Sequence, residues 1–469
     1  MAESNSFMSS IDALMIIFVD FMWGTPLVVL LLGGGLFFTI YSRFTPYRYL
    51  KHAVQIVMGK YDESDDPGQI NHFQALSSAL ASTVGMGNIS GVAIAIHAGG
   101  PGAVFWMWMS AIVGAATKFF TCSLSIMYRG KDDNGETQGG PMYVIHEALN
   151  SKFRFLAVLF SVAGLFGCLA LFQVNQLTQI VSDEIFIPNG MFVDSAMTGN
   201  LIFGIFVAIL VAMVIFGGIR RIGIVASRMV PAMVILYLFA GLLVIFQHFW
   251  AIPSLIKLIV VDAFTGDALL GGAVGTVILM GVRRAAFSNE AGIGTEAMAH
   301  GAAKTQEPIR EGLVAMLGPF IDTIVVCSIT ALVILATGVW QSSEANGVTL
   351  TAQAFTLALP GMGRFLLLAS VGVFSISTMI GYSYYGAKCT SYLFGTKWKK
   401  HYRVFYVITL VIGAAISIDA VINFLDGMFA LMAIPTMVSS LILAPKVMKA
   451  SKKYFSSLEK EKDIDIYPK

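Results

Sequence analysis

Charged residues are scarce in this chain of 469 residues: 12% are Asp, Glu, Lys or Arg, whereas 56% are hydrophobic. A soluble domain carries about 25% charged residues, so this chain has too little polar surface to cover a water-soluble globule. Its net charge of +2 at pH 7 gives no reason to expect nucleic acid as a partner. The composition instead predicts a protein that is embedded in membrane lipid.

Cysteine is scarce as well, and the four cysteines all lie in apolar stretches: Cys122, Cys168, Cys327 and Cys389. Their spacing matches no metal site and predicts no disulfide framework, so we interpret them as small buried hydrophobic residues. The HExxH and GxSxG motifs are missing, as are paired intramembrane aspartates with suitable neighbours. These absences argue against an enzyme, and nothing in the sequence requires an obligatory protein partner.

Long apolar runs dominate what is present. A helix that crosses a bilayer needs about 20 apolar residues, and this criterion predicts eleven spans. The N-terminus lacks the basic segment of a signal peptide, so the first run is expected to remain as a spanning helix. The predicted spans are residues 14–41, 72–97, 102–128, 154–182, 199–219, 225–249, 263–283, 311–338, 364–394, 404–420 and 424–447.

Lysine and arginine are distributed unevenly between the predicted loops. Six alternate segments hold 27 of the 30 Lys and Arg residues, and the opposite loops hold only Lys257 and Arg364. Because these residues favour the cytoplasm, the pattern predicts an N-terminus outside the cell and a C-terminus inside it. The basic segments are 42–70, 129–154, 219–230, 283–311, 388–403 and the tail from residue 446.

An odd number of spans fits one extra helix followed by two units of five helices. Two successive five-helix units lie in opposite orientations, which is the inverted repeat of many secondary transporters. The predicted fold class is therefore an all-α polytopic membrane protein with eleven transmembrane helices and a 5+5 inverted repeat. Its predicted regions are an extra helix and cytoplasmic loop at 1–70, repeats at 71–250 and 251–448, and a cytoplasmic tail at 449–469.

The first helix of each predicted unit contains glycines that favour a break. The second span has three glycines between residues 85 and 91, next to small hydroxyl residues, so unwinding costs little at 83–88. The seventh span has Gly271 and Gly272. An unwound segment exposes carbonyls that suit a cation and amides that suit a carboxylate. The alternative is that these small residues only let helices pack closely.

Polar side chains on other spans suit an ion or a polar ligand. Ser377 and Thr378 are adjacent hydroxyls in the ninth span, which either face a sodium ion or bond back to their own helix. Gln173 in the fourth span needs a partner or a cavity. Asp322 and Lys118 also lie within spans, where they serve either proton coupling or packing.

Five segments, in order along most of the chain, resemble the alanine or glycine:cation symporter family. They are HFQALSSALASTVGMGNISGVAIAIHAGGPGAVFWMW at 72–108, GGPMYVI at 139–145, FSNEAGIGTEAMAHGAAKT at 287–305, GLVAMLGPFIDTIVVCSITALVIL at 312–335 and GYSYYGAKCTSYLFG at 381–395. The resemblance implies eleven helices, ten of which form the inverted-repeat fold of the bacterial leucine transporter. It also implies sodium-driven uptake of small neutral amino acids across a prokaryotic plasma membrane.

The resemblance further implies roles for individual residues around the two predicted breaks. Sodium, the expected coupling ion, would bind to two carbonyls and two hydroxyls, those of Ala81, Val84, Ser377 and Thr378. The substrate carboxylate would be held by Thr83, Gly85 and Gly87, while Asn88 would face a second cation site or brace the break. The remaining expected substrate-binding residues hold the amino group or form walls: Gly271, Gly272, Ala273, Gln173 and Tyr382.

The sequence departs from the family pattern at four positions. Members usually have threonine at Met86, asparagine near Ala170, phenylalanine at Ala273 and tryptophan at Tyr382. Replacing a buried phenylalanine with alanine frees about 150 Å² or more of contact area. We therefore expect a substrate side chain larger than that of alanine, unless Phe172 or Met86 fills the space.

Two other functions stay open from the sequence. A proton-coupled permease of the same fold would use Asp322 or Lys118 in place of sodium. An ion channel would pass ions without saturation by a bound solute.

Overall fold

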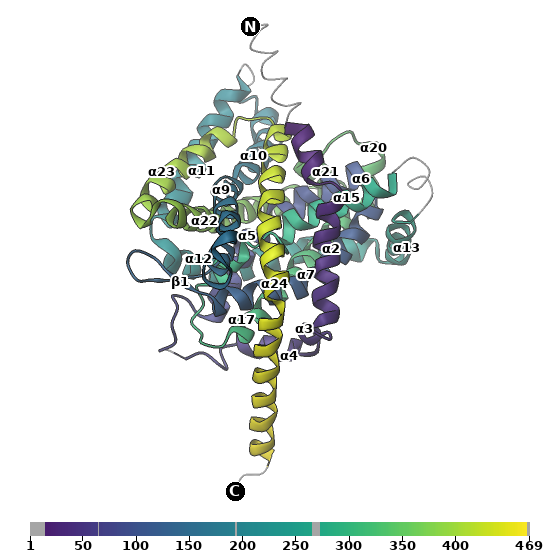
Figure 1. The fold of residues 1–469 in the computed structure, drawn as a ribbon. Coiled ribbons are helices and arrows are strands. Elements are labelled where there is room, and N and C mark those ends of the chain that lie inside the picture. Colours follow the sequence, from purple (N-terminus) through teal and green to yellow (C-terminus); the bar gives the residue numbers. More distant parts are fainter. Residues whose placement is uncertain (1–14, 64, 193–194, 265–272, 467–469) are drawn as a thin grey trace.

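The computed structural model describes residues 15–63, 65–192, 195–264 and 273–466, and it is built almost entirely of helices (Figure 1). In this part of the chain the one sheet is an antiparallel pair, β1 (Gly130–Lys131) and β2 (Thr137–Gln138). The main helices of the first half are α2 (Thr25–Tyr41), α3 (Thr45–Arg48), α4 (Leu50–Val57), α5 (His72–Thr83), α6 (Val92–Gly99), α7 (Gly102–Met127), α8 (Pro141–Ala148), α9 (Arg154–Gly167), α10 (Leu171–Val181), α11 (Ala196–Ile215) and α12 (Gly218–Gln247).

The second half continues with helices of more variable length. They are α13 (Ile252–Asp262), α15 (Ala273–Asn289), α16 (Glu296–His300), α17 (Pro308–Ala315), α18 (Leu317–Pro319), α19 (Ser328–Thr337), α20 (Val339–Ser342), α21 (Gly347–Ala358), α22 (Gly363–Phe394), α23 (Lys399–Gly413) and α24 (Ile418–Ile466). Two π-helical segments also matter for the site: η1 (Gly87–Gly91) and η6 (Phe320–Cys327).

Nine of the eleven predicted spans coincide with helices that are long and apolar enough to cross a bilayer. Eight are helical segments of 20 to 41 residues, and the ninth is a pair of helices, His72–Thr83 and Gly87–Gly99, bent by 52°. The other two predicted spans overlap α15 and α23, whose described lengths are 17 and 15 residues. Both fall short of the roughly 20 residues that a span needs. The structure thus confirms a multi-pass membrane protein, and the count of eleven stays a prediction.

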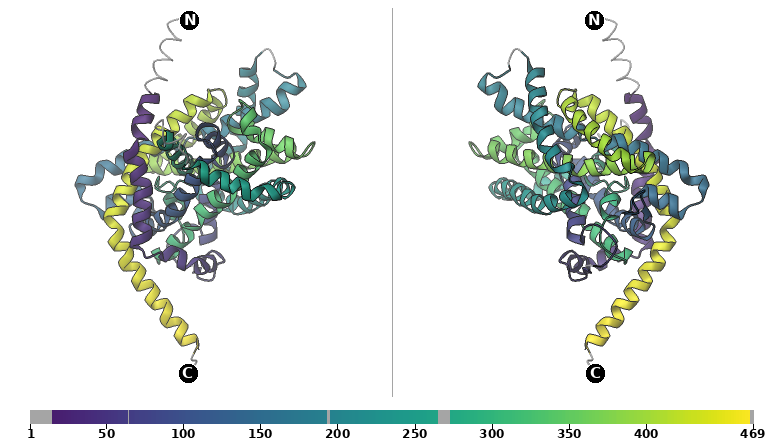
Figure 2. Two further views of the ribbon diagram at one scale, coloured as in Figure 1. Left: turned by 90° about the vertical axis from the view of Figure 1, so that its right-hand side faces the viewer. Right: turned by 90° about the vertical axis from the view of Figure 1, so that its left-hand side faces the viewer.

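The first and last long helices lie side by side on the same face of the molecule (Figure 1, Figure 2). The indole nitrogen of Trp23, just before α2, donates a hydrogen bond to the carbonyl of Asp426 in α24 at 2.9 Å. The described chain begins at one end of the helical body, and α24 projects far beyond the opposite end. This arrangement fits an odd number of crossings.

The loops that were predicted to share a side of the membrane do contact one another. Arg129 donates hydrogen bonds to the carbonyls of Pro67 and Thr305, each at 3.0 Å, which joins three of the basic segments. On the opposite side, Arg364 pairs with Glu184 at 2.6 Å. The separation of the two groups of loops agrees with the predicted topology, whereas the side that faces the cytoplasm stays a prediction.

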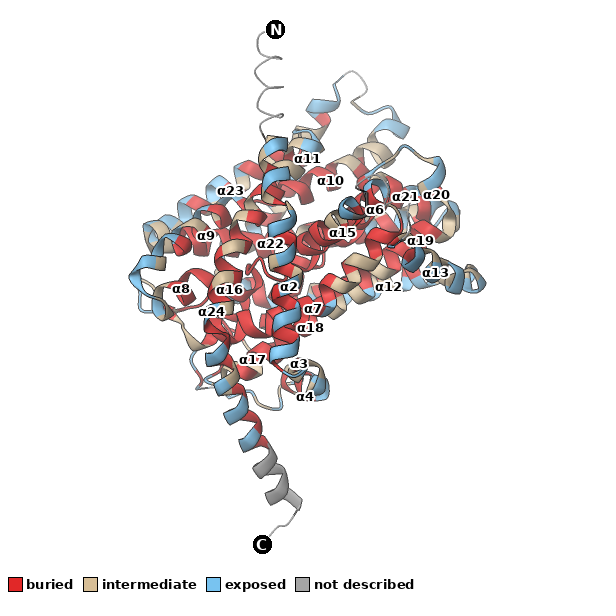
Figure 3. Ribbon diagram, turned by 45° about the vertical axis from the view of Figure 1, so that its right-hand side comes forward, coloured by how far each residue is buried: buried red, intermediate tan, exposed pale blue. Residues whose placement is uncertain are grey.

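Buried residues gather in the centre of the helical body, and exposed residues line its outside (Figure 3). Many of the exposed side chains are large and apolar, including Phe206, Phe239 and Phe246, which are 56%, 55% and 72% exposed. An apolar outer surface on helices is what a bilayer requires. The four cysteines are buried and free, as expected.

Candidate functional site

The structure confirms the predicted break in the second span. Helix α5 ends at Thr83, where a capping residue, Val84, adopts an extended conformation with φ −75° and ψ 95°. The chain resumes as the π-helical η1 from Gly87 and continues into α6. Glycine and small hydroxyl residues make this interruption inexpensive, as the sequence indicated.

The structure describes a second break that the sequence analysis did not predict, while the predicted one stays untested. Gly271 and Gly272 fall outside the described residues, and α15 runs without interruption from Ala273 to Asn289. The chain is instead interrupted between Asn289 and α16, with positive φ at Glu290 (57°), Gly292 (88°) and Gly294 (91°). The segment 283–311 was predicted to be a cytoplasmic loop, and that prediction is wrong for its first half, which is buried helix and break.

The two broken helices pack against each other in opposite directions. The half before the first break, α5, contacts α16, which follows the second break, while η1 and α6 contact α15. They meet at Gly87, where an added Cβ would lie 3.1 Å from the Cα of Ser288. Glycine at position 87 therefore lets the two helices approach closely, which places both breaks in one region.

Three of the predicted sodium ligands, Ala81, Ser377 and Thr378, lie where α22 packs on the first break. Both hydroxyls bond back to a carbonyl of their own helix, which is the alternative that the sequence left open. The hydroxyl of Ser377 donates to the carbonyl of Ala81 at 3.3 Å and to that of Phe374 at 3.0 Å. The hydroxyl of Thr378 also donates to Phe374, at 3.0 Å, and it lies directly against Gly85. The backbone of Val84 immediately precedes Gly85. Hydroxyl and carbonyl oxygens of this kind are the ligands that hard cations prefer.

Asn88 braces the first break from inside. Its side-chain oxygen accepts a hydrogen bond from the amide of Gly85 at 2.8 Å, and its side-chain nitrogen donates to the carbonyl of Asp322 at 3.1 Å. Its own carbonyl accepts from Thr330 at 2.7 Å. The Gly85 amide, which was predicted to hold a carboxylate, is thus already occupied by Asn88 in this conformation.

Two predicted substrate-binding side chains have polar atoms that find no partner within the described part of the chain. They are the hydroxyl of Thr83 and the side-chain oxygen of Gln173, and both residues are buried. A buried polar atom without a hydrogen bond costs about 1–3 kcal/mol. These atoms are consistent with a polar ligand between the helices.

Aromatic contacts connect Gln173's helix to the crossing of the broken helices. Phe172 packs edge-on against Phe287 of α15, with ring centroids 5.0 Å apart. The ring of Phe287 also lies 3.4 Å from where a Cβ at Gly87 would stand. Ala273 is the first residue of α15, at the end of this helix far from Phe287.

Tyr382 reaches the second break rather than the first. Its hydroxyl donates to a carboxylate oxygen of Glu290 at 2.6 Å, and Thr295 donates to the other oxygen of that carboxylate. Glu290 is fully buried. It was not among the predicted site residues, although FSNEAGIGTEAMAH, with its two glycines after an acid, carried a signal for a break.

Asp322 lies at the crossing of the broken helices. One of its carboxylate oxygens accepts hydrogen bonds from Ser288 at 2.6 Å and from Thr323 at 2.8 Å. The other oxygen has no hydrogen bond among the described residues. Asp322 therefore connects η6 to the end of α15, and the hydrogen bond from Asn88 adds the first break to this network.

In this conformation the region is closed to solvent on both sides. The exposed fractions are 3% for Thr83, 2% for Gln173 and 1% for both Ser377 and Thr378.

Comparison with solved structures identifies the fold of this chain. The structure is similar to the crystal structure of MhsT in complex with L-phenylalanine, with a TM-score of 0.57 over 81% of this chain and 98% of that one, at 12% sequence identity. This similarity establishes the fold, which is the leucine-transporter fold that the sequence analysis expected.

The particular family follows from the sequence. The chain belongs to the sodium:alanine symporter family, whose model matches residues 8–467. It is 40% identical to a sodium/alanine symporter of Methanococcus maripaludis over 93% of this chain and 95% of that protein. It is also 33% identical to a protein of Bacillus subtilis named as a probable sodium/glutamine symporter, over 96% of this chain and 91% of that protein. The chain is therefore a multi-pass transporter of the cation-coupled amino-acid type.

Proposed function

We propose that this protein carries a small neutral amino acid into the cell together with sodium, by alternating access. The observation that carries this proposal is that two hydroxyl residues of α22 contact the first break: Thr378 contacts Gly85, and Ser377 contacts Ala81. In this arrangement, the Ser377 hydroxyl contacts the carbonyl of Ala81, the Thr378 hydroxyl lies against Gly85, and all four residues are buried. The membership in a sodium:alanine symporter family supports the same ion.

The proposed sodium site lies on both sides of a junction that must separate during transport. Sodium held between α22 and the first break stabilises the closed arrangement that also receives the amino acid. Coupling then requires sodium to bind more tightly to the conformation that binds substrate, and the effect is reciprocal. An inward membrane potential adds about 2.3 kcal/mol per charge per 100 mV to the driving force.

The proposed substrate site extends from the first break to α10 and the second break. Thr83 and the amides after the break would hold the carboxylate, and the Gly85 amide would exchange its bond to Asn88 for the ligand. Gln173 would supply an acceptor, which has no partner among the described residues, for a donor of the substrate. Tyr382 would act as a wall through its bond to Glu290. Gly271 and Gly272 stay predicted contacts of the amino group, and Ala273 stays a predicted residue of the pocket wall.

A substrate side chain larger than that of alanine is a second part of the proposal. It rests on the sequence pattern alone: position 273 holds alanine where the family usually has phenylalanine. Ala273 lies at the end of α15 far from Phe287, and Phe172 packs against Phe287 at the crossing of the broken helices. One relative is named for alanine and another for glutamine, so both sizes occur among similar proteins. Competition of labelled uptake by glycine, alanine, serine, glutamine and leucine would test this. Strict preference for glycine and alanine would contradict it.

The decisive experiment for the function uses purified protein in liposomes. An imposed inward sodium gradient should drive accumulation of a labelled neutral amino acid, and replacing sodium by potassium should abolish it. Uptake driven by a pH gradient in sodium-free buffer would instead assign the protein as a proton-coupled permease, and ion currents without solute saturation would indicate a channel.

A further inference from the structure

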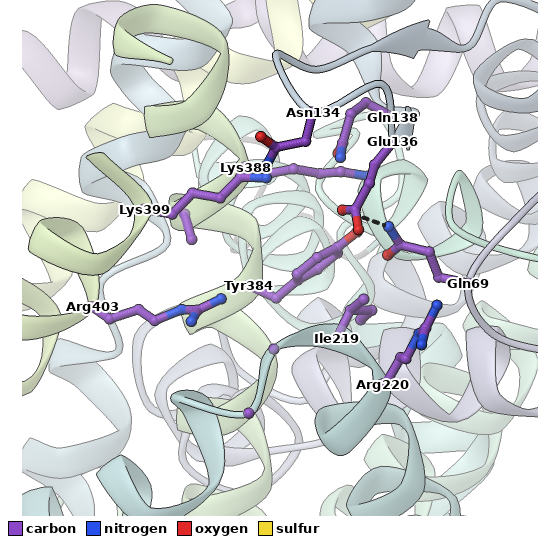
Figure 4. Close-up of a pocket in the computed structure, with 13 residues that line it drawn as sticks. Gln69, Asn134, Glu136, Gln138, Ile219, Arg220, Tyr384, Lys388, Lys399 and Arg403 are labelled. Carbon is purple, nitrogen blue, oxygen red and sulfur yellow. Dashed lines mark hydrogen bonds between the residues drawn. The ribbon is translucent and has the colours of Figure 1, made fainter. Parts of the chain in front are cut away.

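A polar pocket of about 410 Å³ opens among the basic loops on the side predicted to face the cytoplasm. Figure 4 shows Arg403 and Arg220 extending into it from opposite sides, with the ring of Tyr384 between them. The pocket is also lined by Lys388, Lys399 and one carboxylate, that of Glu136. Glu136 already accepts a hydrogen bond from Gln69 at 3.2 Å. Four cations therefore share one pocket with a single acidic group.

Lys388 is the most unusual of these cations because it is buried. The residue is 2% exposed. Its Nζ donates a hydrogen bond to the carbonyl of Met298 at 3.0 Å and lies 5.1 Å from the centre of the Tyr384 ring. Among the described residues it forms no ion pair with a carboxylate, and neither do Arg403 and Arg220. Lys399, by contrast, pairs with Asp132 at 2.9 Å. A buried cation without a counter-charge is costly, so an anion in the pocket would be stabilising.

The pocket lies in line with the core site along one helix. On α22, Thr378, Gly381, Tyr385 and Lys388 are spaced three or four residues apart, which places them on one face. Thr378 contacts the first break, and Gly381 contacts Ser82 of α5. Lys388 is ten residues beyond Thr378, a distance of about 15 Å along a helix. Gln69, just before α5, lines the pocket at the other end of the α5–α22 contact.

This geometry indicates a path that is closed by the packing of α5 on α22. If these helices separate toward the cytoplasm, a ligand that leaves the core site moves along the α22 face and reaches Lys388 next. Of the groups on a neutral amino acid, the carboxylate is the one that a lysine and two arginines attract. The pocket is also large enough to hold such a ligand entirely.

We propose that this pocket is an exit site, in which Lys388, assisted by Arg403, binds the carboxylate of the amino acid on its way to the cytoplasm. The proposal rests on the proposed function, because it takes the same amino acid as its ligand. It predicts that the affinity for substrate presented from the cytoplasmic side depends on Lys388, while the affinity from the outside depends on the core site alone.

The experiment compares right-side-out and inside-out membrane vesicles that contain the full-length protein. In each, sodium-driven uptake of labelled amino acid is measured against its concentration. For Lys388→Met we expect the half-saturating concentration in inside-out vesicles to rise about tenfold, with little change in right-side-out vesicles. Lys388→Arg should keep the wild-type value. Lys400→Met is the matched control, because Lys400 is an exposed lysine on α23 that does not line the pocket.

A second variant guards against loss of folding. Arg403→Gln should raise the same inside-out value in the same direction, with protein amounts matched by immunoblotting. Equal shifts from both sides would overturn the proposal, as would no shift for Lys388→Met while right-side-out uptake is intact. Competition by inorganic phosphate that depends on Lys388, with unchanged amino-acid affinity, would assign the pocket to a phosphate group and also overturn it. Absence of any amino-acid uptake by the wild type would reject the proposed function itself.

Discussion

The hydroxyl of Thr378 lies so close to the α-carbon of Gly85 that a methyl group at position 85 would overlap it. The two residues are 293 positions apart, and their contact joins α22 to the unwound segment of the second span. The contact is also where carbonyls and hydroxyls meet in the proposed sodium site. Changes on either side of this contact are therefore expected to affect ion dependence before they affect the fold.

Gly85→Ala should abolish most transport while the protein still folds. The added methyl group overlaps the hydroxyl of Thr378 and displaces it from the break, which removes one of the proposed sodium ligands from the site. Gly91→Ala is the matched control, because an added Cβ there meets no atom within 4 Å. Uptake and size-exclusion profiles of both variants would check this. Equal transport activity of the two variants would contradict a functional role for the close contact between Gly85 and Thr378.

Thr378→Ala should raise the sodium concentration for half-maximal uptake by about tenfold or more, since loss of one hard oxygen ligand weakens a small site. Thr378→Ser should restore the wild-type response. Thr390→Ala serves as the control: Thr390 is on the same helix and donates to the carbonyl four residues before it, at 2.8 Å, as Thr378 does at 3.0 Å. A sodium response of Thr378→Ala equal to that of the control would remove Thr378 from the site.

Tyr382→Phe should lower thermal stability and slow transport. The variant leaves the Glu290 carboxylate with Thr295 as its remaining side-chain donor, and an unsatisfied buried acceptor costs about 1–3 kcal/mol. Thermal unfolding in detergent would measure the loss against Tyr41→Phe, a change on an exposed part of α2. If the two variants melted at the same temperature, the hydrogen bond between Tyr382 and Glu290 would not contribute to the stability of the protein.

The ion pair between Asp132 and Lys399 should stabilise the loops around the pocket over a wide pH range. Burial alone would raise the pKa of Asp132, but Lys399 and the amides of Asn134 and Glu136 outweigh it and hold this pKa below its usual value. A lowered pKa in the folded state gives stability that is present at neutral pH and is lost as the pH falls through that value.

The melting temperature of the wild type minus that of Asp132→Asn would test this. The difference should be constant from about pH 8 to pH 5 and shrink only below about pH 4. A difference that disappeared between pH 7 and pH 5 would contradict the lowered pKa.

The first break could be predicted from the sequence because its cause is local. Glycines and small hydroxyl residues between positions 82 and 91 weaken a helix wherever it is placed. The long apolar runs likewise reveal spans, since hydrocarbon excludes unpaired backbone from lipid-facing positions. The partition of basic loops to one side follows from charge alone, and the contacts of Arg129 agree with it.

The break after Asn289 was not predicted because its sequence resembles that of a loop. Arg283 and Arg284 suggested the end of a span, but in the structure both are buried and pair with Asp426 of α24, with Arg283 at 2.6 Å. That partner is 143 residues away, so no local pattern indicates that the charges are neutralised. Glu290 is accommodated in the same way, by Tyr382 from another helix.

The sequence by itself determined that this protein crosses a membrane many times, where the first break lies, and which family it resembles. These properties depend on composition, on local backbone preference and on ordered motifs. Only the tertiary structure decided that Gly85 meets Thr378, that Gly87 meets Ser288, and that the second interruption follows Asn289. These contacts join residues hundreds of positions apart, and a buried charge is tolerated only where the fold supplies its partner.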